Sequence, residues 1–555
     1  MRARLVVTAT ALADTMRNPA LRRVQLSFAS VWTSEWALTV AVGVIAFNDG
    51  GAALVGIIAA LRMAVPALVS PFSSALADQL RRDRLLFWAG LVRSAATALA
   101  ALLLAFHGPE VAMYALLILA ACAFIVVRAA GTALVPLLCN SPQELTSAMA
   151  TRGLFDSTST LVGPLLAALL LGLSTPAVVV AVAALLSAVS SALLTGLAYD
   201  APARVGSTFS LKHLAVEEAE GLAAIRRNAD AGVLIALALV QTFVRGGLTV
   251  FLVVLAFTVL HTGDAGVGLL TAALGAGATV GSVAAFSLVM GHRLALVEGL
   301  GVALWGLPLM ASAGVTSGLA LALLIGVIGV GNALADVGGF TLMARLVPEE
   351  LLGRLFGTFE SLIALTVALG SLVAPLLIDH LGLRAALLIV GVVAPVAALL
   401  ATPRLLRVDR SVRRLDDEIG VLRRVAMLQP LPLPVIEHLA EHVGHLHVAE
   451  GTDVFREGDA GDYLYVIERG TADVFRDGRM VLHLDEGECF GEVALLRSIP
   501  RTATVRAHAE LDLQTVGRAE FLLAVAGSAA TGREAQHLLH ERLKVIAPVM
   551  NAEDA

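Results

Sequence analysis

The chain of 555 residues is nearly free of lysine and poor in cysteine and in charge. Its two lysines are Lys212 and Lys544, and neither follows a glycine, so an ATP-driven pump built on a Gly-Lys-Ser/Thr loop is excluded. The three cysteines form no Cys-x-x-Cys pair, which argues against a disulfide framework or a zinc site. Because no nucleophile elbow, kinase signature or metal signature occurs, we expect no enzyme, no metal and no cofactor.

Charged residues make up 15% of the chain, against about 25% in a soluble protein. The excess of apolar residues lies between residues 24 and 402, whereas residues 404–555 have an ordinary soluble composition. The net charge of −6 is too small to indicate a nucleic-acid partner. The sequence therefore predicts a protein of the lipid bilayer with a soluble C-terminal part.

The apolar part divides at its polar breaks into about 12 stretches long enough to span a membrane. The first two lie near residues 24–47 and 52–77, and the last near 383–402. Arginines gather on alternate breaks, which predicts that both chain ends lie in the cytoplasm. The breaks that carry them lie at Arg22–Arg23, Arg81–Arg84, Arg226–Arg227 and Arg404–Arg410. The expected location is the plasma (inner) membrane.

Two halves of the apolar part repeat each other. The strings LVGPLL and LVAPLL contain Pro164 and Pro375, which are 211 residues apart, and PQEL and PEEL precede them at Pro142 and Pro348. Two six-helix halves joined by residues 201–230 fit this offset. Such repeats around a central site are typical of secondary transporters.

The loop that follows the second stretch, residues 74–84, reads SALADQLRRDR. It resembles the first cytoplasmic loop of the major facilitator superfamily, and residues 331–357 are similar to the second half of its exporter-like members. The resemblance implies that Asp78 and Arg82 act in gating. A solvated cytoplasmic loop is an equally good interpretation of its arginines.

Charges within apolar spans are costly, so they are candidates for function. Glu35 and Arg245 are 210 residues apart, close to the repeat offset, and we expect them either to form an ion pair or to line the cavity. Glu35 is the first candidate for a proton carrier, followed by Asp156 and Asp336. Arg128 and Asp336 occupy corresponding spans, where bracing of helices is the alternative to substrate contact.

The soluble part contains the segment CFGEVALLRSIPRTATVRA at residues 489–507. Glu492 can accept a hydrogen bond from a sugar hydroxyl, Arg501 can bind a phosphate, and Gly491 permits close approach of the backbone. This segment resembles the phosphate-binding cassette of cyclic nucleotide-binding domains, the family of the cAMP-dependent kinase regulatory subunit and the catabolite activator. The resemblance implies Glu492 on the ribose, Arg501 on the cyclic phosphate, and a binding segment of Gly491, Glu492, Val493, Ala494, Arg501, Thr502 and Ala503.

Strand-like alternation and regular glycines after His447 predict a β jelly-roll barrel, and helices are expected at residues 428–443, 518–526 and 533–546. The resemblance implies that the last of these is a lid over the base. His438 and His442 have the spacing of metal ligands, but no third ligand is placed convincingly, so we expect no metal there. Thr502 leaves cGMP possible, although cAMP is favoured as the regulatory ligand.

The expected architecture is a multi-pass, all-helical membrane domain followed by the barrel. Its divisions are residues 1–23 as a cytoplasmic N-terminal segment, 24–402 as the transporter domain, 403–427 as a linker helix, 428–546 as the cyclic nucleotide-binding domain and 547–555 as a tail. We expect a secondary transporter, an exporter of an unidentified small molecule, regulated by cyclic nucleotide. A membrane receptor that no longer transports and a transporter with a degenerate sensor remain open. A nucleotide-gated channel is excluded because the sequence lacks a Thr-Val-Gly-Tyr-Gly filter.

Overall fold

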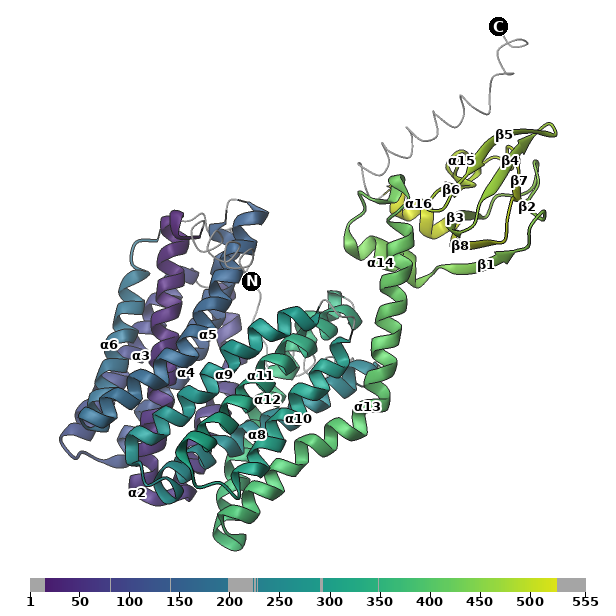
Figure 1. Ribbon diagram of the computed structural model, residues 1–555. Helices are drawn as coiled ribbons and strands as arrows, with labels where there is room; N and C mark the ends of the chain where they lie inside the picture. Colours follow the sequence, from purple (N-terminus) through teal and green to yellow (C-terminus); the bar gives the residue numbers. More distant parts are fainter. Residues whose placement is uncertain are drawn as a thin grey trace. The chain divides into compact units, whose positions relative to one another are not determined.

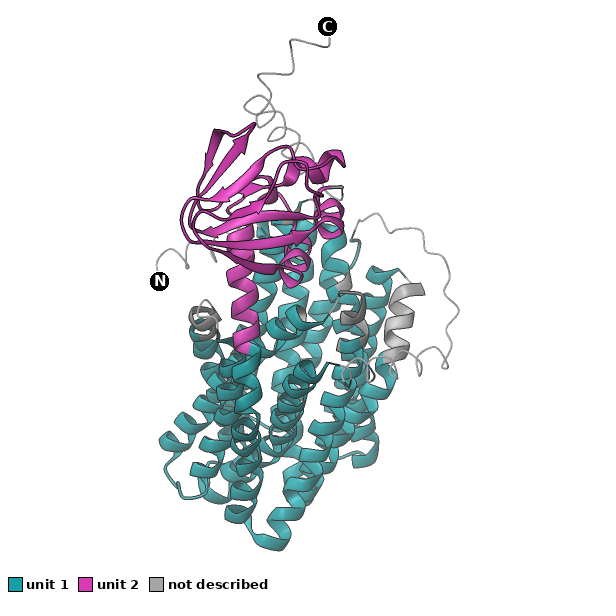
Figure 2. Cartoon of the chain, turned by 90° about the vertical axis from the view of Figure 1, so that its right-hand side faces the viewer, with its two compact units in different colours: residues 1–408 teal, residues 409–555 magenta. Residues whose placement is uncertain are grey.

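The computed structural model describes residues 15–79, 81–139, 141–197, 228–289, 293–347 and 349–526, together with residues 223 and 226. The chain divides into two compact units, residues 1–408 and 409–555 (Figure 2). The first unit is helical, and the second combines helices with two β-sheets (Figure 1).

The first unit is a bundle of long apolar helices. In chain order they are α2 (Pro19–Gln79), α3 (Arg82–Ala105), α4 (Glu110–Leu138), α5 (Pro142–Leu173), α6 (Pro176–Leu193), α8 (Ala229–Val254) with the π-helical turn η1 (Leu255–Val259), α9 (Gly263–Val289), α10 (Leu294–Ser312), α11 (Gly318–Leu346), α12 (Glu349–Leu381) and α13 (Leu383–Leu422). Within the described ranges, 11 helices are long and apolar enough to cross a bilayer. The chain is therefore built as a membrane protein.

The long helix α2 contains a break that explains part of the difference from 12 expected spans. Its 61 residues would extend about 90 Å, three times the hydrocarbon thickness of a bilayer. Gly50 and Gly51 interrupt the helical dihedrals, and Gly51 has φ of +62°, a conformation that favours glycine. The expected spans at residues 24–47 and 52–77 lie on either side of this break. The number of 12 spans stays a prediction.

The two halves of the bundle meet at several pairs of helices, of which two are the most extensive in the described residues. α2 packs against α12, and α5 packs against α9. Close approach depends on glycine: a Cβ built on Gly268 would lie 2.7 Å from the backbone nitrogen of Ala168, and one on Gly275 would lie 2.5 Å from the carbonyl oxygen of Thr160. The small residues seen in the sequence thus let the backbones of opposite halves touch.

The repeated motifs occupy equivalent places in the two halves. α5 begins at Pro142, where the Ser141 hydroxyl accepts a hydrogen bond from the Glu144 amide at 3.1 Å. α12 begins within the second PxEL motif, and Pro164 and Pro375 lie inside α5 and α12. The motifs therefore mark the fifth helix of each half, as the sequence offset predicts.

Helix α13 is longer than expected. It runs from Leu383 to Leu422 through Pro395 and Pro403, so the helix expected at residues 403–427 is present as far as Leu422 and continues the last apolar helix without a break. The predicted apolar face is present, because Ile419 and Leu422 are buried in a core cluster of the second unit. The end of α13 is therefore part of the core of that unit.

The second unit contains two four-stranded antiparallel sheets, with strand orders β1-β8-β3-β6 and β2-β7-β4-β5. Apolar side chains of both sheets form a common core. The strands are β1 (Gly444–Val448), β2 (Asp453–Phe455), β3 (Tyr463–Arg469), β4 (Ala472–Arg476), β5 (Arg479–Leu484), β6 (Cys489–Phe490), β7 (Thr504–Ala507) and β8 (Leu511–Gly517). This arrangement is the predicted jelly roll.

Short helices flank the sheets. They are η2 (Ala426–Leu428), α14 (Leu433–Glu441), α15 (Glu492–Arg497) and α16 (Arg518–Ala526). α16 has the bounds that the sequence predicts. The expected lid helix at residues 533–546 lies outside the described residues.

Candidate functional site

The cassette predicted at residues 489–507 is a continuous segment of the second unit. β6 leads into Gly491, α15 follows, and β7 closes the segment. Gly491 has φ of +91°, and a Cβ built there would collide with Nη1 of Arg501. Only glycine both adopts this backbone without strain and leaves room for the arginine.

Arg501 lies folded into the cassette and is only 4% exposed. Its Nη1 donates to the Gly491 carbonyl and its Nη2 to the Tyr463 carbonyl, each at 2.9 Å. The guanidinium carbon lies 4.2 Å from the centre of the Phe455 ring. Burial lowers the pKa of Arg501, although an arginine stays protonated in a protein. A buried cation held by neutral carbonyls can gain a stronger partner in a phosphate.

All seven predicted binding residues line one pocket. They are Gly491, Glu492, Val493, Ala494, Arg501, Thr502 and Ala503. Glu492, at the start of α15, is 1% exposed. The cavity measures about 40 Å³, far below the roughly 300 Å³ of a small ligand pocket. Ligand entry therefore requires that side chains in this pocket move.

Phe455 and Tyr463 both contact Arg501, and neither was assigned a role from the sequence. Phe455 contributes its ring and Tyr463 its carbonyl oxygen. Phe455 lies 46 residues before Arg501, and only the pairing of β2 with β7 brings the two together. A carbonyl acceptor leaves no trace in residue identity, so only the fold reveals it.

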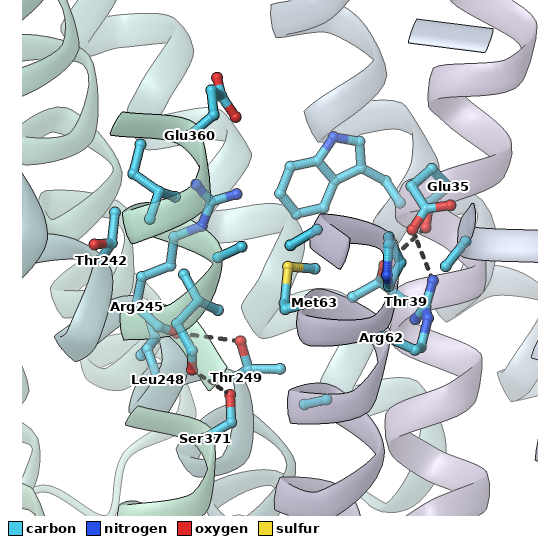
Figure 3. A pocket seen from close by; sticks show the side chains of 18 of the residues that line it. Glu35, Thr39, Arg62, Met63, Thr242, Arg245, Leu248, Thr249, Glu360 and Ser371 are labelled. Carbon is cyan, nitrogen blue, oxygen red and sulfur yellow. Dashed lines mark hydrogen bonds and ion pairs between the residues drawn. The ribbon is translucent and has the colours of Figure 1, made fainter. Parts of the chain in front are cut away.

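A cavity of about 460 Å³ opens between the two halves of the first unit. Residues of α2, α4, α8, α9, α10, α11 and α12 line it. Most of its lining is apolar, and seven charged side chains reach it. They are Glu35, Arg62, Arg128, Arg245, Glu298, Asp336 and Glu360. Figure 3 labels Glu35, Arg62, Arg245 and Glu360 among them.

Glu35 is bound by two arginines of its own half. Its Oε1 lies 2.7 Å from Nη2 of Arg62 and its Oε2 lies 2.8 Å from Nη2 of Arg93, whose side chain is fully buried. Figure 3 shows Glu35 and Arg245 on opposite sides of the cavity. The ion-pair alternative for these two residues is therefore wrong, because equivalent depth in two halves places side chains on facing walls. Both residues do line the cavity.

Arg245 and Asp336 both line the cavity wall of the second half. Asp336 accepts a hydrogen bond from Asn332 at 2.8 Å, and Asn332 accepts one from Gln241 at 3.2 Å. Arg245 is exposed to the cavity and forms no side-chain hydrogen bond or ion pair with the described residues. It is a cation available to a ligand.

Arg128 forms an ion pair that joins the two halves. Its Nη2 lies 3.0 Å from Oε2 of Glu360, so the side chains of α4 and α12 meet across the cavity. Both side chains are exposed, at 40% and 49%. Asp156, the remaining candidate, lies on α5 and is not among the described residues that line this cavity.

Glu298 was not recognised from the sequence. It lies on α10, is 1% exposed, and its Oε2 is buried without a hydrogen-bond partner in the described part of the chain. It packs against Gly338 and Gly339 of α11. The signal that could have found it is a single carboxylate in the apolar stretch LALVEGLGVALWG.

The proposed gating residues fall at the junction of α2 and α3. Arg82 is the first residue of α3 and is partly buried. Asp78 lies near the end of α2, but its side chain is outside the described set. The gating role of both residues stays a prediction.

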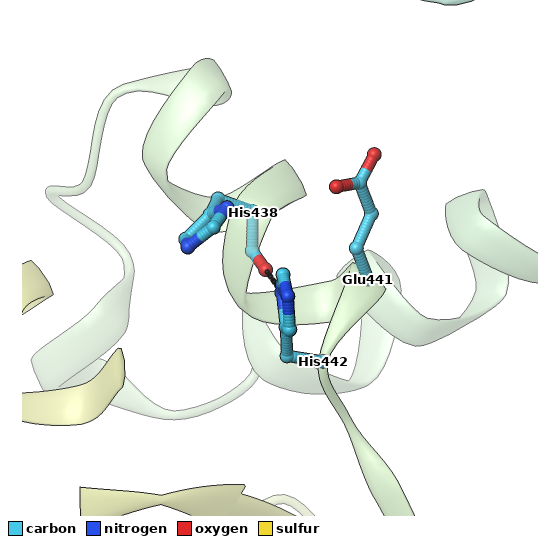
Figure 4. A group of neighbouring side chains, drawn as sticks. All are labelled: His438, Glu441 and His442. Atoms are coloured by element: carbon cyan, nitrogen blue, oxygen red, sulfur yellow. Dashed lines mark hydrogen bonds between the residues drawn. The ribbon is translucent and has the colours of Figure 1, made fainter. Parts of the chain in front are cut away.

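Two histidines and a glutamate gather at the end of α14 (Figure 4). Ligand atoms of His438, Glu441 and His442 lie within 4.8 Å of one another, and all three residues are exposed. Nδ1 of His442 is engaged with the His438 carbonyl at 2.8 Å. One nitrogen of this cluster is thus already committed to the backbone.

Two similar helical halves enclosing a charged cavity define the class of secondary transporters. The family model of the Major Facilitator Superfamily matches residues 25–297 and 290–441, and the chain belongs to this superfamily. The model of the cyclic nucleotide-binding domain matches residues 445–526. A transporter domain and a cyclic nucleotide-binding domain thus share one chain.

Curated relatives match the C-terminal part. The cAMP-dependent protein kinase regulatory subunit of Yarrowia lipolytica is 38% identical over 122 residues, which are 22% of this chain and 32% of that protein. That of Mucor circinelloides f. lusitanicus is 36% identical over 104 residues, 18% of this chain and 24% of that protein. Each match spans a third or less of the relative's length.

Solved structures also match this part. The regulatory domain of Toxoplasma gondii PKA with cAMP is 24% identical with a TM-score of 0.22, covering 24% of this chain and 52% of that one. The regulatory subunit of a cAMP-independent protein kinase A from Trypanosoma brucei is 22% identical with a TM-score of 0.22, covering 24% of this chain and 50% of that one.

Proposed function

We propose that this protein is a secondary active transporter of a small molecule and that a cyclic nucleotide regulates it from the second unit. The observation that carries the proposal is the cavity of about 460 Å³, lined by charged side chains from both halves. A cavity between two halves can be exposed alternately to either side of a membrane. Export is the direction suggested by the similarity of residues 331–357 to exporter-like members.

The cavity also supports proton coupling. Glu298 is a buried carboxyl with an unpartnered oxygen, and Asp336 faces the cavity near the available cation Arg245. A carboxyl in an apolar bilayer is stabilised in its neutral form, and it can exchange a proton when the cavity changes sides. Glu35 is a weaker candidate than the sequence suggested, because two arginines hold its charge.

We propose cAMP as the regulatory ligand. The seven cassette residues share one pocket, and the names of the curated relatives contain cAMP. A Thr502 hydroxyl is also able to bind a guanine amino group, so cGMP is the competitor to test. Arg501 would exchange its two carbonyl partners for the cyclic phosphate.

Regulation requires that the nucleotide prefer one transport state over the other. The segment from Leu405 to Arg424 is the covalent route between the units, and we propose it as the coupling element. The positive-inside pattern supports a cytoplasmic position of the second unit, where cyclic nucleotides are made. The plasma (inner) membrane is the proposed location.

Two measurements on the purified full-length protein test this function. Calorimetry with cAMP and cGMP measures binding to the wild type, to Arg501→Ala and to the control Arg506→Ala, whose arginine pairs with Asp453 outside the pocket. Proteoliposomes screened with a panel of labelled small molecules, with and without the nucleotide, measure transport. Nucleotide-dependent flux that Arg501→Ala abolishes supports the proposal. Binding without any flux indicates a receptor, and flux without binding indicates a degenerate sensor.

A further inference from the structure

A second cluster of potential metal ligands lies on the sheet β2-β7-β4-β5. Asp473 is on β4, His483 is directly opposite it on β5, and His508 follows the last residue of β7. β7 also pairs with β4, and the His508 amide donates to the Thr471 carbonyl at 2.9 Å. The register of three strands therefore fixes the three side chains relative to one another.

The three side chains converge on the Asp473 carboxylate. Nδ1 of His483 lies 2.5 Å from Oδ1, and Nδ1 of His508 lies 2.8 Å from Oδ2. The two rings are nearly perpendicular, with centroids 5.3 Å apart. Asp473 is 8% exposed although it faces away from the pocket, because the imidazoles cover it.

This donor set is that of a zinc-type site. Two imidazole nitrogens and a carboxylate oxygen bind Zn²⁺ at about 2.0–2.2 Å, with a fourth position open to water. Tetrahedral ligands at such lengths are about 3.3 Å apart, so a small rotation of the rings makes room for an ion. The imidazole proton then resides on Nε2, and for His483 that atom faces Asp485 Oδ1 at 3.9 Å. At this distance Asp485 forms no hydrogen bond with the ring, and the proposal does not depend on it.

We propose that His483, His508 and Asp473 bind a divalent transition-metal ion of the Zn²⁺ class on the outer face of the nucleotide-binding unit. The cluster differs from that of His438 and His442, which lies on one short helix and has a nitrogen bonded to the backbone. Strand register brings the proposed ligands together from three segments. The proposal depends neither on transport nor on nucleotide binding.

Cobalt titration of the full-length protein in detergent, with any histidine tag removed and the protein pretreated with chelator, tests the site. Co²⁺ in a tetrahedral nitrogen and oxygen site absorbs visible light, whereas aqueous Co²⁺ hardly does. We expect one such Co²⁺ per chain, displaced by Zn²⁺. The affinity falls at least about 10-fold in Asp473→Asn and in His508→Gln.

The control is the double variant His438→Gln, His442→Gln, which should bind Co²⁺ as the wild type does. His508 is well exposed, so His508→Gln reports on the site even if Asp473→Asn fails to fold. The proposal is overturned if the wild type gives no visible Co²⁺ bands, or if His508→Gln keeps them. It is also overturned if the bands disappear in the control.

Discussion

At the scale of the residue, the two units bury arginine in different ways. Arg501 is held by two neutral carbonyls, whereas Arg93 and Arg62 share the carboxylate of Glu35. Two arginines that share one carboxylate are partly neutralised, so they have less to gain from an anion than a cation whose partners are neutral. A buried cation whose partners are neutral carbonyls acquires an oppositely charged partner when an anion binds. Arg501 therefore suits a binding site, and the Glu35 cluster suits a structural brace.

Replacement of Arg501 by alanine should weaken cyclic nucleotide binding about 30-fold or more, since loss of a buried charge-assisted contact costs about 2 kcal/mol or more. Arg506→Ala removes an arginine on the outer surface and should leave the dissociation constant unchanged. Calorimetry measures both. Equal losses in the two variants would show that Arg501 is not a ligand contact.

Removal of the charge should change the stability of the first unit much more at Glu35 than at Glu298. Glu35→Gln leaves two arginines buried without their anion and should destabilise the first unit by about 3–5 kcal/mol. Glu298→Gln keeps the shape of a carboxyl without a charged partner and should change stability little. Thermal unfolding monitored by tryptophan fluorescence reports on this unit, because all four tryptophans lie in it. Similar unfolding temperatures for both variants would contradict the assignment.

The sequence predicted which charged residues line the cavity, but it did not predict the partners of these residues. Glu35, Arg245 and Asp336 were placed on the cavity by their position in apolar stretches. The partners of these charges depend on how the helices pack against one another. The spacing of residues along the sequence does not reveal this packing. Glu298 was missed because it stands near the start of a predicted span, where a charge is expected to reach water. The seven predicted cassette residues share one pocket because they lie within 19 consecutive residues, whereas Phe455 and Tyr463, which contact Arg501, lie outside that segment and could not be predicted.

At the scale of the element, the pair Arg128–Glu360 links opposite halves by charge. Both side chains are exposed, so we expect a contribution to stability of only about 0.2–1 kcal/mol. Its larger effect should be on conformation, since α4 and α12 belong to opposite halves, which the proposed transport cycle would separate.

Arg128→Glu should therefore increase the population in which α4 and α12 lie farther apart, and the double variant Arg128→Glu, Glu360→Arg should restore the wild-type distribution. Distances between spin labels on the two helices measure this. If the single variant leaves the distribution unchanged, the pair does not bias the two states. A double variant that behaves like the single one would show that the charges act separately.

The strand pair β1–β8 should be sensitive to pH. His447 lies opposite Asp512, with Nδ1 2.7 Å from Oδ1, and this hydrogen bond raises the pKa of His447. A raised pKa in the folded state stabilises the strands at pH values below about 6.5, and that contribution disappears as the pH rises through the folded pKa. Hydrogen exchange in β1 and β8 should be slower in the wild type than in His447→Gln at pH 6. The two proteins should be alike at pH 9, and a difference of the same size at both values would refute the assignment.

Elements were predicted where their signals are local. α16 has its predicted bounds, and α5 begins at its PxEL motif, because capping and alternation act over a few residues. The continuity of the linker helix with the last apolar helix was not predicted. Pro403 and a change in composition suggested an end, but a proline within a helix is tolerated when packing supports the flanking turns.

At the scale of the whole molecule, each unit has its own apolar core. The clusters around Leu134 and Phe359 belong to the first unit, and those around Phe490 and Phe521 belong to the second. Fold class and order of the units could be predicted because composition changes so sharply near residue 403. The pairing of α2 with α12 and of α5 with α9 could not, since it depends on contacts between distant segments.

Unfolding of the full chain should therefore occur in two separate transitions. A saturating nucleotide, at about 100 times its dissociation constant, should stabilise the second unit by about 2.7 kcal/mol and leave the tryptophan-monitored transition of the first unit in place. Calorimetric scans with and without cAMP measure both. A single transition, or an equal shift of both, would show that the units unfold as one.

The glycines at the α5–α9 contact have a practical consequence for preparing this protein. Gly268 and Gly275 let two backbones touch, so one methyl group at either position holds the helices apart. Alanine there would trap the molecule in whichever arrangement separates α5 from α9. A variant with alanine at Gly268 or Gly275 would then populate one conformation more than the wild type does. Such a sample would be more homogeneous for imaging.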